Sequence, residues 1–194
     1  MRKQQQPPTR RPHRWRGTME TLLLALFMVF LVRIIVQNFH VEGQSMEPTL
    51  HDQEYILVDK AVYLFQPPQR GDIVVFQYPR NPRERYVKRI IAVPGDIVSV
   101  IDSQIIVDGV TLREPYVNKT DNYNPFPSFK KRIVAPDEYF VLGDNRGNSS
   151  DSRDWGLVPR HYIIGRAAVV YWPFNANNLG LLPDTASVFS AIHN

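Results

Sequence analysis

The sequence predicts a mainly β domain, a coiled antiparallel sheet of barrel-like form, preceded by one N-terminal transmembrane helix. Three observations support this fold class. A single long apolar stretch lies near the N-terminus of the 194-residue chain. The later apolar residues form short runs that are rich in β-branched and aromatic residues and are separated by Gly, Pro, Asn and Asp. One Asp-Gly pair between two such runs is typical of a tight hairpin.

The N-terminal tail, residues 1–17, is strongly basic. Its basic residues are Arg2, Lys3, Arg10, Arg11, Arg14 and Arg16, and residues 1–16 contain no acid. From residue 37 onward the chain has sixteen basic and eighteen acidic residues. The overall charge of +4 therefore resides in the tail. This distribution argues against a nucleic-acid groove in the folded part, and it suits a cytoplasmic membrane surface.

Residues 18–37 are predicted to form a transmembrane anchor helix. Residues 22–32 (LLLALFMVFLV) are uninterrupted and apolar, and the apolar pattern resumes after Arg33. A helix over residues 18–36 would be about 28 Å long, which matches the hydrocarbon core of a bilayer. Because basic residues precede the span, the N-terminus should be cytoplasmic and residues 38–194 extracytoplasmic.

Three other interpretations of the apolar stretch are open. A buried core helix fits poorly beside a basic leader rich in Pro and Gln. A cleaved secretory signal fits better, but the sequence FHVEG at 39–43 is a poor small-x-small cleavage site. A transit peptide is disfavoured by Pro7, Pro8 and Pro12, which would disrupt its amphipathic helix.

The segments expected to form strands follow the anchor in quick succession. They are residues 54–58, 72–76, 86–93, 97–101, 104–107, 139–142 and 167–172. Asp108-Gly109 joins 105–107 to 110–112 in the predicted hairpin. Loops are expected at 67–68, 79–82, 94–95 and 124–127. No long helical period occurs after Val36, and the stretch after Phe174 is expected to be loosely ordered.

Several kinds of chemistry are excluded by composition. The chain has no cysteine, so it has no cysteine nucleophile, disulfide or thiolate metal site. Its five histidines are scattered without HExxH or other paired spacing, so no metal site is expected. There is no GxSxG elbow and no glycine-rich phosphate loop. Nucleophilic catalysis would need a base other than histidine.

Lys88 is the candidate base. Ser–Lys pairs are known variants of the catalytic triad, and they need a lysine that is neutral near the working pH. Burial favours this state by lowering the lysine pKa. Of the six lysines, only Lys88 lies within a run of large apolar residues, YVKRII at 86–91. Lys119, Lys130 and Lys131 are expected in a polar loop region. Tyr86, Lys88 and Ile90 would share one face of a strand. The alternative is an ordinary lysine on a solvated strand face.

Ser45 is the candidate nucleophile, in the segment GQSMEPTL at 43–50. Gly43 permits close backbone approach, and Pro48 stiffens the loop. Ser45 follows the apolar stretch by nine residues, so it should stay near the membrane and reach peptide bonds just outside the bilayer. The alternative is an ordinary loop serine.

A dense polar segment, GDNRGNSSDSRDWG at 143–156, follows a predicted strand. Its Asx and Ser side chains can cap backbone groups and build a rigid network. Asp151 and Arg153 are spaced to form an ion pair. The alternative is an ordinary surface loop.

Together these segments resemble the type I signal peptidases, the bacterial leader peptidases. The matching stretches are GQSMEPTL, GDIVVFQYP, YVKRIIAVPGD and VLGDNRGNSSDSRDWG, in the family's order after a single N-terminal span. The resemblance covers residues 18–173. It implies a mostly β peptidase domain that needs no cofactor and removes N-terminal signal peptides from exported preproteins. The substrate would bind in extended form, with small residues at the first and third positions before the cut.

The resemblance also implies residue roles. Ser45 matches the nucleophile and Lys88 the general base, acting through an acyl-enzyme. Ser149 matches a hydroxyl that orients the lysine amine. The supporting polar network is matched by Asp144, Asp151 and Arg153.

On the substrate side, Met46 matches a residue that lines the cleft. Gly43 occupies a position where some members have a serine that helps to hold the oxyanion. That hydroxyl donor is absent here, so the oxyanion hole would depend more on the Ser45 backbone N–H.

The expectation is therefore a monomeric, single-pass enzyme of the cell membrane with its N-terminus in the cytoplasm. Its partners would be signal-peptide-bearing preproteins and phospholipid, and not nucleic acid. The short segment 102–135 leaves no room for a large accessory domain. Two alternatives are a related Ser–Lys peptidase with a narrow client, and a non-catalytic membrane-tethered scaffold. In the scaffold, Ser45 and Lys88 would be dispensable.

Overall fold

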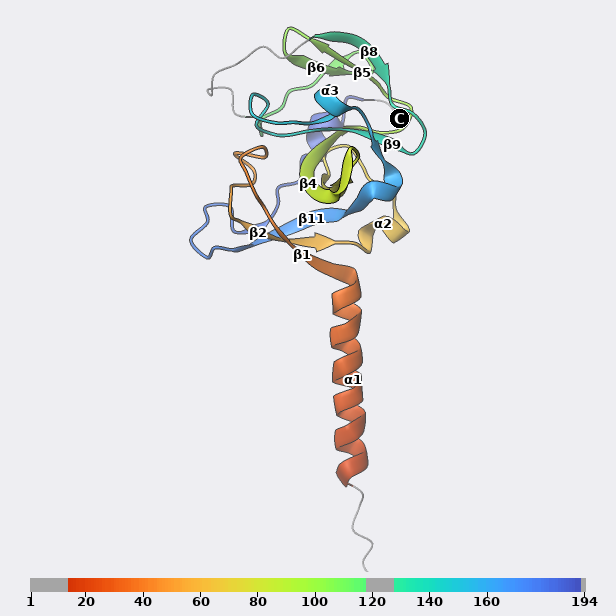
Figure 1. The fold of residues 1–194 in the computed structure, drawn as a ribbon, viewed down its shortest axis with the longest axis vertical. Helices are drawn as coiled ribbons and strands as arrows, with labels where there is room; N and C mark the ends of the chain where they lie inside the picture. Colours follow the sequence, from red (N-terminus) through yellow and green to blue (C-terminus); the bar gives the residue numbers. More distant parts are fainter. Residues whose placement is uncertain (1–13, 118–127, 193–194) are drawn as a thin grey trace, which may run out of the picture. The chain divides into compact units, whose positions relative to one another are not determined.

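The computed structural model describes residues 14–117 and 128–192. The chain divides into two compact units, Met1–Ile35 and Val36–Asn194, which are described separately (Figure 1). The predicted loop at 124–127 and Lys119 lie outside the described residues.

The described part of the first unit is one helix, α1 (Arg14–Ile35). Its stretch Gly17–Ile35 has a mean hydropathy of 2.1 and is long and apolar enough to cross a membrane. Helix α1 begins four residues before the predicted anchor and ends two residues before its predicted end, because Val36 is the first residue of a strand.

The second unit is mainly β, as predicted. Its larger sheet has the order β1-β2-β11-β3-β4-β9-β10, with β12 paired to β11, and every pairing is antiparallel. Its strands are β1 (Val36–His40), β2 (Tyr55–Asp59), β3 (Ile73–Tyr78), β4 (Asn81–Ala92), β9 (Glu138–Leu142), β10 (Val158–Pro159), β11 (Ile163–Trp172) and β12 (Gly180–Leu181).

The smaller sheet has the order β7-β6-β5-β8. Its strands are β5 (Ile97–Ile101), β6 (Gln104–Val107), β7 (Val110–Thr111) and β8 (Phe129–Ile133). The predicted Asp-Gly hairpin is confirmed, since Val107 pairs with Val110 across it. Within this unit the smaller sheet lies at one end, β1, β2 and β11 lie at the other, and β4 and β9 lie between them (Figure 1).

Short helices complete the unit, and among residues 37–117 and 128–192 none is long. They are α2 (Val62–Phe65), α3 (Ser152–Trp155), and the 3₁₀ turns η1 (Arg160–Tyr162) and η2 (Ala186–Phe189). Buried apolar side chains form three clusters. The cluster nearest the candidate site packs Val41, Met46 and Leu50 against Ile56 and Val75 of the larger sheet. This packing fixes the polypeptide between β1 and β2 as an ordered loop.

Four predictions need correction. Residues 81–82 belong to β4 and not to a loop, and residues 36–37 belong to a strand and not to the anchor. Lys130 and Lys131 lie on the edge strand β8, not in a loop. The stretch after Phe174 is ordered, because Phe189 and Ile192 are buried in the cluster around the smaller sheet.

Candidate active site

Ser45 lies on the loop that joins β1 to β2. Backbone hydrogen bonds close the base of this loop, from Val41 N to Glu54 O (2.8 Å) and from Gln53 N to Val41 O (2.9 Å). Met46, which follows Ser45, is buried in the core and is 1% exposed. The loop therefore holds its apolar side chains in the core and leaves Ser45 partly exposed.

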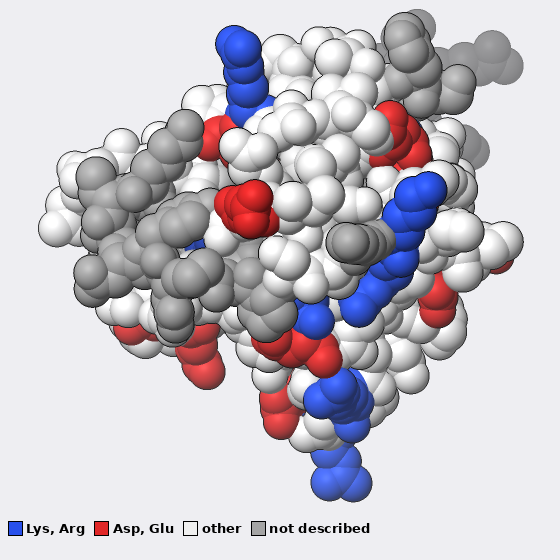
Figure 2. Space-filling view, turned by 90° about the horizontal axis from the view of Figure 1, so that it is seen from above, with Lys and Arg blue, Asp and Glu red and all other residues white. Residues whose placement is uncertain are grey.

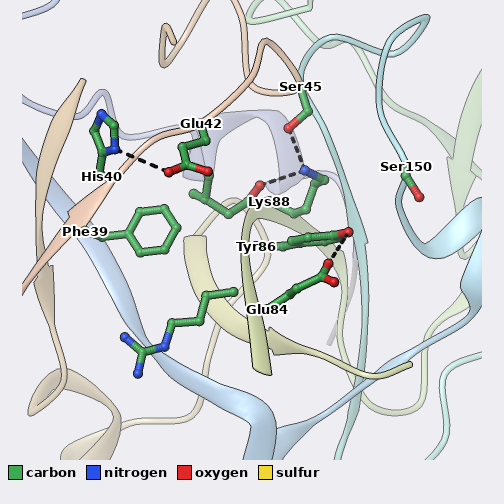
Figure 3. A pocket seen from close by; sticks show the side chains of 10 residues that line it. Phe39, His40, Glu42, Ser45, Glu84, Tyr86, Lys88 and Ser150 are labelled. Atoms are coloured by element: carbon green, nitrogen blue, oxygen red, sulfur yellow. Dashed lines mark hydrogen bonds and ion pairs between the residues drawn. The ribbon is translucent and has the colours of Figure 1, made fainter. Parts of the chain in front are cut away.

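Lys88 lies on β4, 43 residues away in sequence, and meets Ser45 directly. Its Nζ lies 2.6 Å from Ser45 Oγ and donates to the Val87 carbonyl at 3.0 Å. The ring of Tyr86 lies on the same side of β4, with its centroid 5.5 Å from Nζ. Figure 3 shows both bonds of the amine, and the Tyr86 ring beneath it. The sequence predicted that Tyr86 and Lys88 share one face of a strand, and the structure agrees.

The surroundings of Lys88 favour its neutral form. The residue is only 4% exposed. Burial lowers the pKa of its amine from 10.5 to about 8, against the opposing charges of Asp151 and Asp144, which raise it. A substantial fraction of the amine is therefore unprotonated at mildly alkaline pH, when it can accept a proton from the adjacent hydroxyl.

Ser45 and Lys88 border a cleft of about 530 Å³. Phe39, His40 and Glu42 line it from the β1 side, and residues 84–88 line it from β4. Phe39, His40, Glu42, Glu84 and Tyr86 surround the open space in Figure 3. Strands β1 and β4 both border the cleft, and an extended chain segment is the kind of ligand that lies along strands.

A buried ion pair lies behind the site. Arg89 makes a bidentate pair with Asp144, with Nε–Oδ1 at 2.8 Å and Nη2–Oδ2 at 2.6 Å, and neither side chain is exposed. Thr49, from the Ser45 loop, donates to the same carboxylate. Thr185, near the C-terminus, accepts from Arg89 at 3.0 Å. One buried ion pair thus joins β4, the Ser45 loop, the polar segment after β9 and the C-terminal region.

The polar segment after β9 touches the Ser45 loop through Asn145. Its backbone N–H donates to Ser45 O (3.1 Å) and its Nδ2 donates to Gln44 O (3.1 Å). Gly143 is needed for this approach, because a Cβ there would overlap the Ser45 carbonyl and the Ser149 side chain. The two segments can pack this closely only with glycine at position 143.

The predicted pairing of Asp151 with Arg153 is present. Arg153 Nε and Nη2 reach the Asp151 carboxylate at 2.8 and 2.7 Å. Asp151 also caps α3 with its side chain and accepts from Gly143 N at 3.1 Å. This carboxylate therefore stiffens the segment that holds Asn145 against the Ser45 loop.

Ser149 and Gly43 differ in part from expectation. Ser149 Oγ is buried, and within residues 14–117 and 128–192 it has no hydrogen-bond partner, Lys88 included. Its packing against Gly143 still places it beside the Ser45 loop. The backbone N–H of Gly43 donates to Asp52 Oδ1 at 2.6 Å, so it is already occupied.

Arg89, Thr49 and Asn145 were not identified from sequence. A signal for Arg89 existed, because it follows Lys88 within the same apolar run and neighbouring residues on a strand face opposite sides. If both faces of the strand are covered by other residues, neither Lys88 nor Arg89 is solvated. Arg89 then needs a buried partner of opposite charge. Thr49 and Asn145 gave no signal that separates them from ordinary loop residues.

In the described part of the chain, no group of three or more His, Asp or Glu is placed to hold a metal ion. Acidic and basic side chains are interspersed on the face of the molecule shown in Figure 2.

The comparisons with known proteins identify the family of the chain. The model of the family "Signal peptidase, peptidase S26" matches residues 15–172. The chain belongs to this family. It is 38% identical to signal peptidase I of Leptolyngbya laminosa, over 80% of this chain and 79% of the relative. It is 39% identical to signal peptidase I of Bacillus amyloliquefaciens, over 80% of this chain and 87% of the relative.

Two further relatives are similar. The probable signal peptidase I-2 of Synechocystis is 36% identical, over 95% of this chain and 84% of the relative. A solved structure of a signal peptidase I from Enterococcus faecalis V583 is 37% identical and has a TM-score of 0.45, covering 52% of this chain and 97% of that one. Family membership makes the chain a peptidase of the signal-peptide-processing class. It also confirms the resemblance read from the four sequence stretches.

Proposed function

We propose that the protein is a membrane-bound serine endopeptidase that removes signal peptides from exported preproteins by means of a Ser45–Lys88 dyad. The contact between Ser45 Oγ and Lys88 Nζ, 2.6 Å long at the edge of the cleft, is the observation that carries this proposal. A serine hydroxyl is a weak nucleophile on its own, and an adjacent unprotonated amine activates it.

In the proposed reaction, neutral Lys88 takes the Ser45 proton as Oγ attacks the scissile carbonyl. The Ser45 backbone N–H donates to the oxyanion of the tetrahedral intermediate. The protonated amine of Lys88 then gives its proton to the leaving amine, which releases the mature protein and leaves Ser45 acylated by the signal peptide. Lys88 next deprotonates a water molecule, which hydrolyses the ester.

The supporting groups act through geometry. Asp144 and Asp151 hold the Ser45 loop and the polar segment after β9 together, through Arg89, Thr49 and Gly143. Both carboxylates are 0% exposed and occupied by guanidinium partners, so they can support Lys88 without competing for the Ser45 proton. We assign the buried hydroxyl of Ser149 and the side chain of Arg153 to the same supporting shell. Met46, which was expected to line the cleft, is instead 1% exposed and packed in the core.

We further propose that α1 anchors the enzyme in the cell membrane as a single pass. The basic tail before it, which has no acidic residue up to position 16, favours a cytoplasmic N-terminus and a catalytic unit outside. Anchoring would raise the effective concentration of membrane-tethered preproteins. Protease protection of the second unit in sealed vesicles would test the orientation, and the mass of the detergent complex would test the proposed monomer.

The decisive experiment is cleavage, by the detergent-solubilised full chain, of a preprotein whose signal peptide ends in Ala-x-Ala. Wild type should cut after the last Ala, and Ser45→Ala and Lys88→Ala should be inactive although folded. Ser190→Ala and Lys60→Ala, which alter the same residue types away from the cleft, should be active. Cutting by Ser45→Ala at the wild-type rate would end the proposal and favour the scaffold alternative.

A further inference from the structure

The side chain of Asp52 links the two arms of the loop that carries Ser45. The backbone bonds between Val41, Gln53 and Glu54 close its base. One step closer to Ser45, Asp52 Oδ1 accepts from Gly43 N at 2.6 Å. Asp52 therefore joins the chain before Ser45, at Gly43, to the chain that returns toward β2.

Gly43 needs this restraint more than another residue would. Its φ is +87°, in the left-handed region, and a Cβ built on it would meet nothing within 4 Å. A glycine in open space rotates at little steric cost. The bond to Asp52 is the only hydrogen bond from the Gly43 N–H in the described residues, and it fixes the plane of the Glu42–Gly43 peptide, which leads into Gly43.

The direction of the Ser45 N–H is set by the plane of the Gln44–Ser45 peptide. Because the peptide group is planar and trans, the Ser45 N–H points away from the Gln44 carbonyl in the same plane. Asn145 Nδ2 holds that carbonyl, and Asn145 N holds the carbonyl of Ser45. Asn145 thus holds the Gln44–Ser45 and Ser45–Met46 peptide planes, and Asp52 holds the Glu42–Gly43 plane.

We propose that Asp52 is a positioning residue for the oxyanion hole: by holding Gly43 N, it fixes the Glu42–Gly43 peptide plane and limits the backbone rotation at Gly43 that would displace the Ser45 N–H, which donates to the oxyanion. This inference rests on the proposed dyad function, because it concerns the same reaction. It also explains how the enzyme functions with glycine at position 43. The Gly43 N–H is bound to Asp52 and does not serve as a second donor, so the Ser45 N–H carries more of the stabilisation.

The ionisation of Asp52 suits this role. The Gly43 N–H bond is the largest cause that lowers the pKa of Asp52 below 3.8. The carboxylate therefore stays charged at neutral pH, and a charged acceptor makes a shorter and stronger bond to an N–H group than a neutral one does.

The test compares Asp52→Ala and Asp52→Asn in the full chain, with a peptide substrate that contains Ala-x-Ala followed by further residues. A matching peptide boronic acid is the second probe, because its tetrahedral adduct mimics the oxyanion. Asp52→Ala should lower kcat about tenfold to hundredfold and keep KM within about twofold of the wild-type value. It should weaken the binding of the boronic acid by a factor similar to the loss in kcat. Asp52→Asn should keep kcat within about threefold of wild type, because its amide oxygen still accepts the bond.

Asp108→Ala is the matched control. Asp108 Oδ1 is also exposed and accepts a backbone N–H, from Ile97 at 2.8 Å, but in the smaller sheet. Its kcat should equal that of wild type. If Asp52→Ala does not fold, Asp52→Glu replaces it, since the longer side chain keeps the charge but displaces the acceptor. Asp52→Glu should then have a lower kcat than Asp52→Asn.

Three results would overturn the inference. These are an unchanged kcat in Asp52→Ala, a loss in Asp52→Asn as large as in Asp52→Ala, and an effect confined to KM. Ser45→Ala, run in parallel, separates the two proposals. If Ser45→Ala is inactive while Asp52→Ala behaves like wild type, only the positioning role fails. If Ser45→Ala is active, the dyad itself fails.

Discussion

Replacing Lys88 by methionine should stabilise the fold, and the gain should disappear at alkaline pH. Methionine has a similar length but no charge to bury. The difference between the ordinary lysine pKa of 10.5 and about 8 in the folded protein corresponds to about 3 kcal/mol of stability. Lys88→Met should therefore be about 3 kcal/mol more stable than wild type at pH 7, less the small contribution of the lost bond to Ser45.

The sign of the pH dependence follows from the protons bound in each state. Below about pH 8 the amine is charged in both the folded and the unfolded protein, so wild type bears the full cost of the buried charge. Between about pH 8 and 10.5 the folded amine is neutral while the unfolded amine is charged. The unfolded state then binds more protons, and the stability of wild type rises with pH.

The assay is equilibrium unfolding of the full chain in detergent, followed by the fluorescence of the buried Trp155. The free energy of unfolding is measured for wild type and Lys88→Met from about pH 7 to 10.5. The other titrating groups cancel in the difference, which should shrink by about 3 kcal/mol. Lys131→Met, which removes an exposed lysine, controls for the loss of one surface charge. A difference that stays constant over the whole range would refute the reasoning.

Three further predictions concern the site. The kcat/KM for preprotein cleavage should rise with pH, with an apparent midpoint near 8, because Lys88 must be neutral in the free enzyme; initial rates across pH test this, and a fall over that range would contradict it. Gly143→Ala should lower kcat by about a hundredfold with the fold intact by circular dichroism, because its Cβ would displace the Ser45 carbonyl; wild-type kcat would exclude the close contact. Arg89→Met should lower the free energy of unfolding by about 3–5 kcal/mol, because Asp144 is left as a buried charge without its cation. Adding Asp144→Asn should recover part of this loss, and no recovery would mean that packing of Arg89 dominates.

The strands of the smaller sheet could be predicted closely because their residues alternate between buried and exposed positions. Segments 97–101 and 104–107 match β5 and β6 at both ends, and the Asp-Gly turn fixes their neighbour. Strand β8 was missed because Lys130, Lys131 and Arg132 fill its centre. It is an edge strand paired only with β5, so its outer side tolerates charge and it lacks an alternating pattern.

The boundary between α1 and β1 could not be read from sequence. Ile34, Ile35 and Val36 continue the apolar run without a capping residue, glycine or proline. β-branched residues fit either a membrane helix or a strand. What decides the matter is the pairing of Val36 with Asp59 on β2, a long-range contact that leaves no trace in the local pattern.

The candidate dyad could be nominated from sequence, because cysteine is absent, the histidines are scattered, and four stretches resembled one family. Its geometry could not. The sequence gives no measure of the distance between Ser45 and Lys88, and the buried pair of Arg89 and Asp144 spans 55 positions. Pairs of this kind depend on which strands become neighbours, and that is decided by the packing of the whole domain.

Strand order explains how the site is assembled. β1 and β4 both line the cleft, yet β2, β11 and β3 separate them in the sheet. The sheet must therefore coil until its edge strand β1 approaches β4, as the accumulated twist of antiparallel strands allows. Because β1 and β4 do not pair, the barrel is left open at the cleft. An extended substrate that entered there could supply the missing strand, and Ser45 and Lys88 already face each other at this opening.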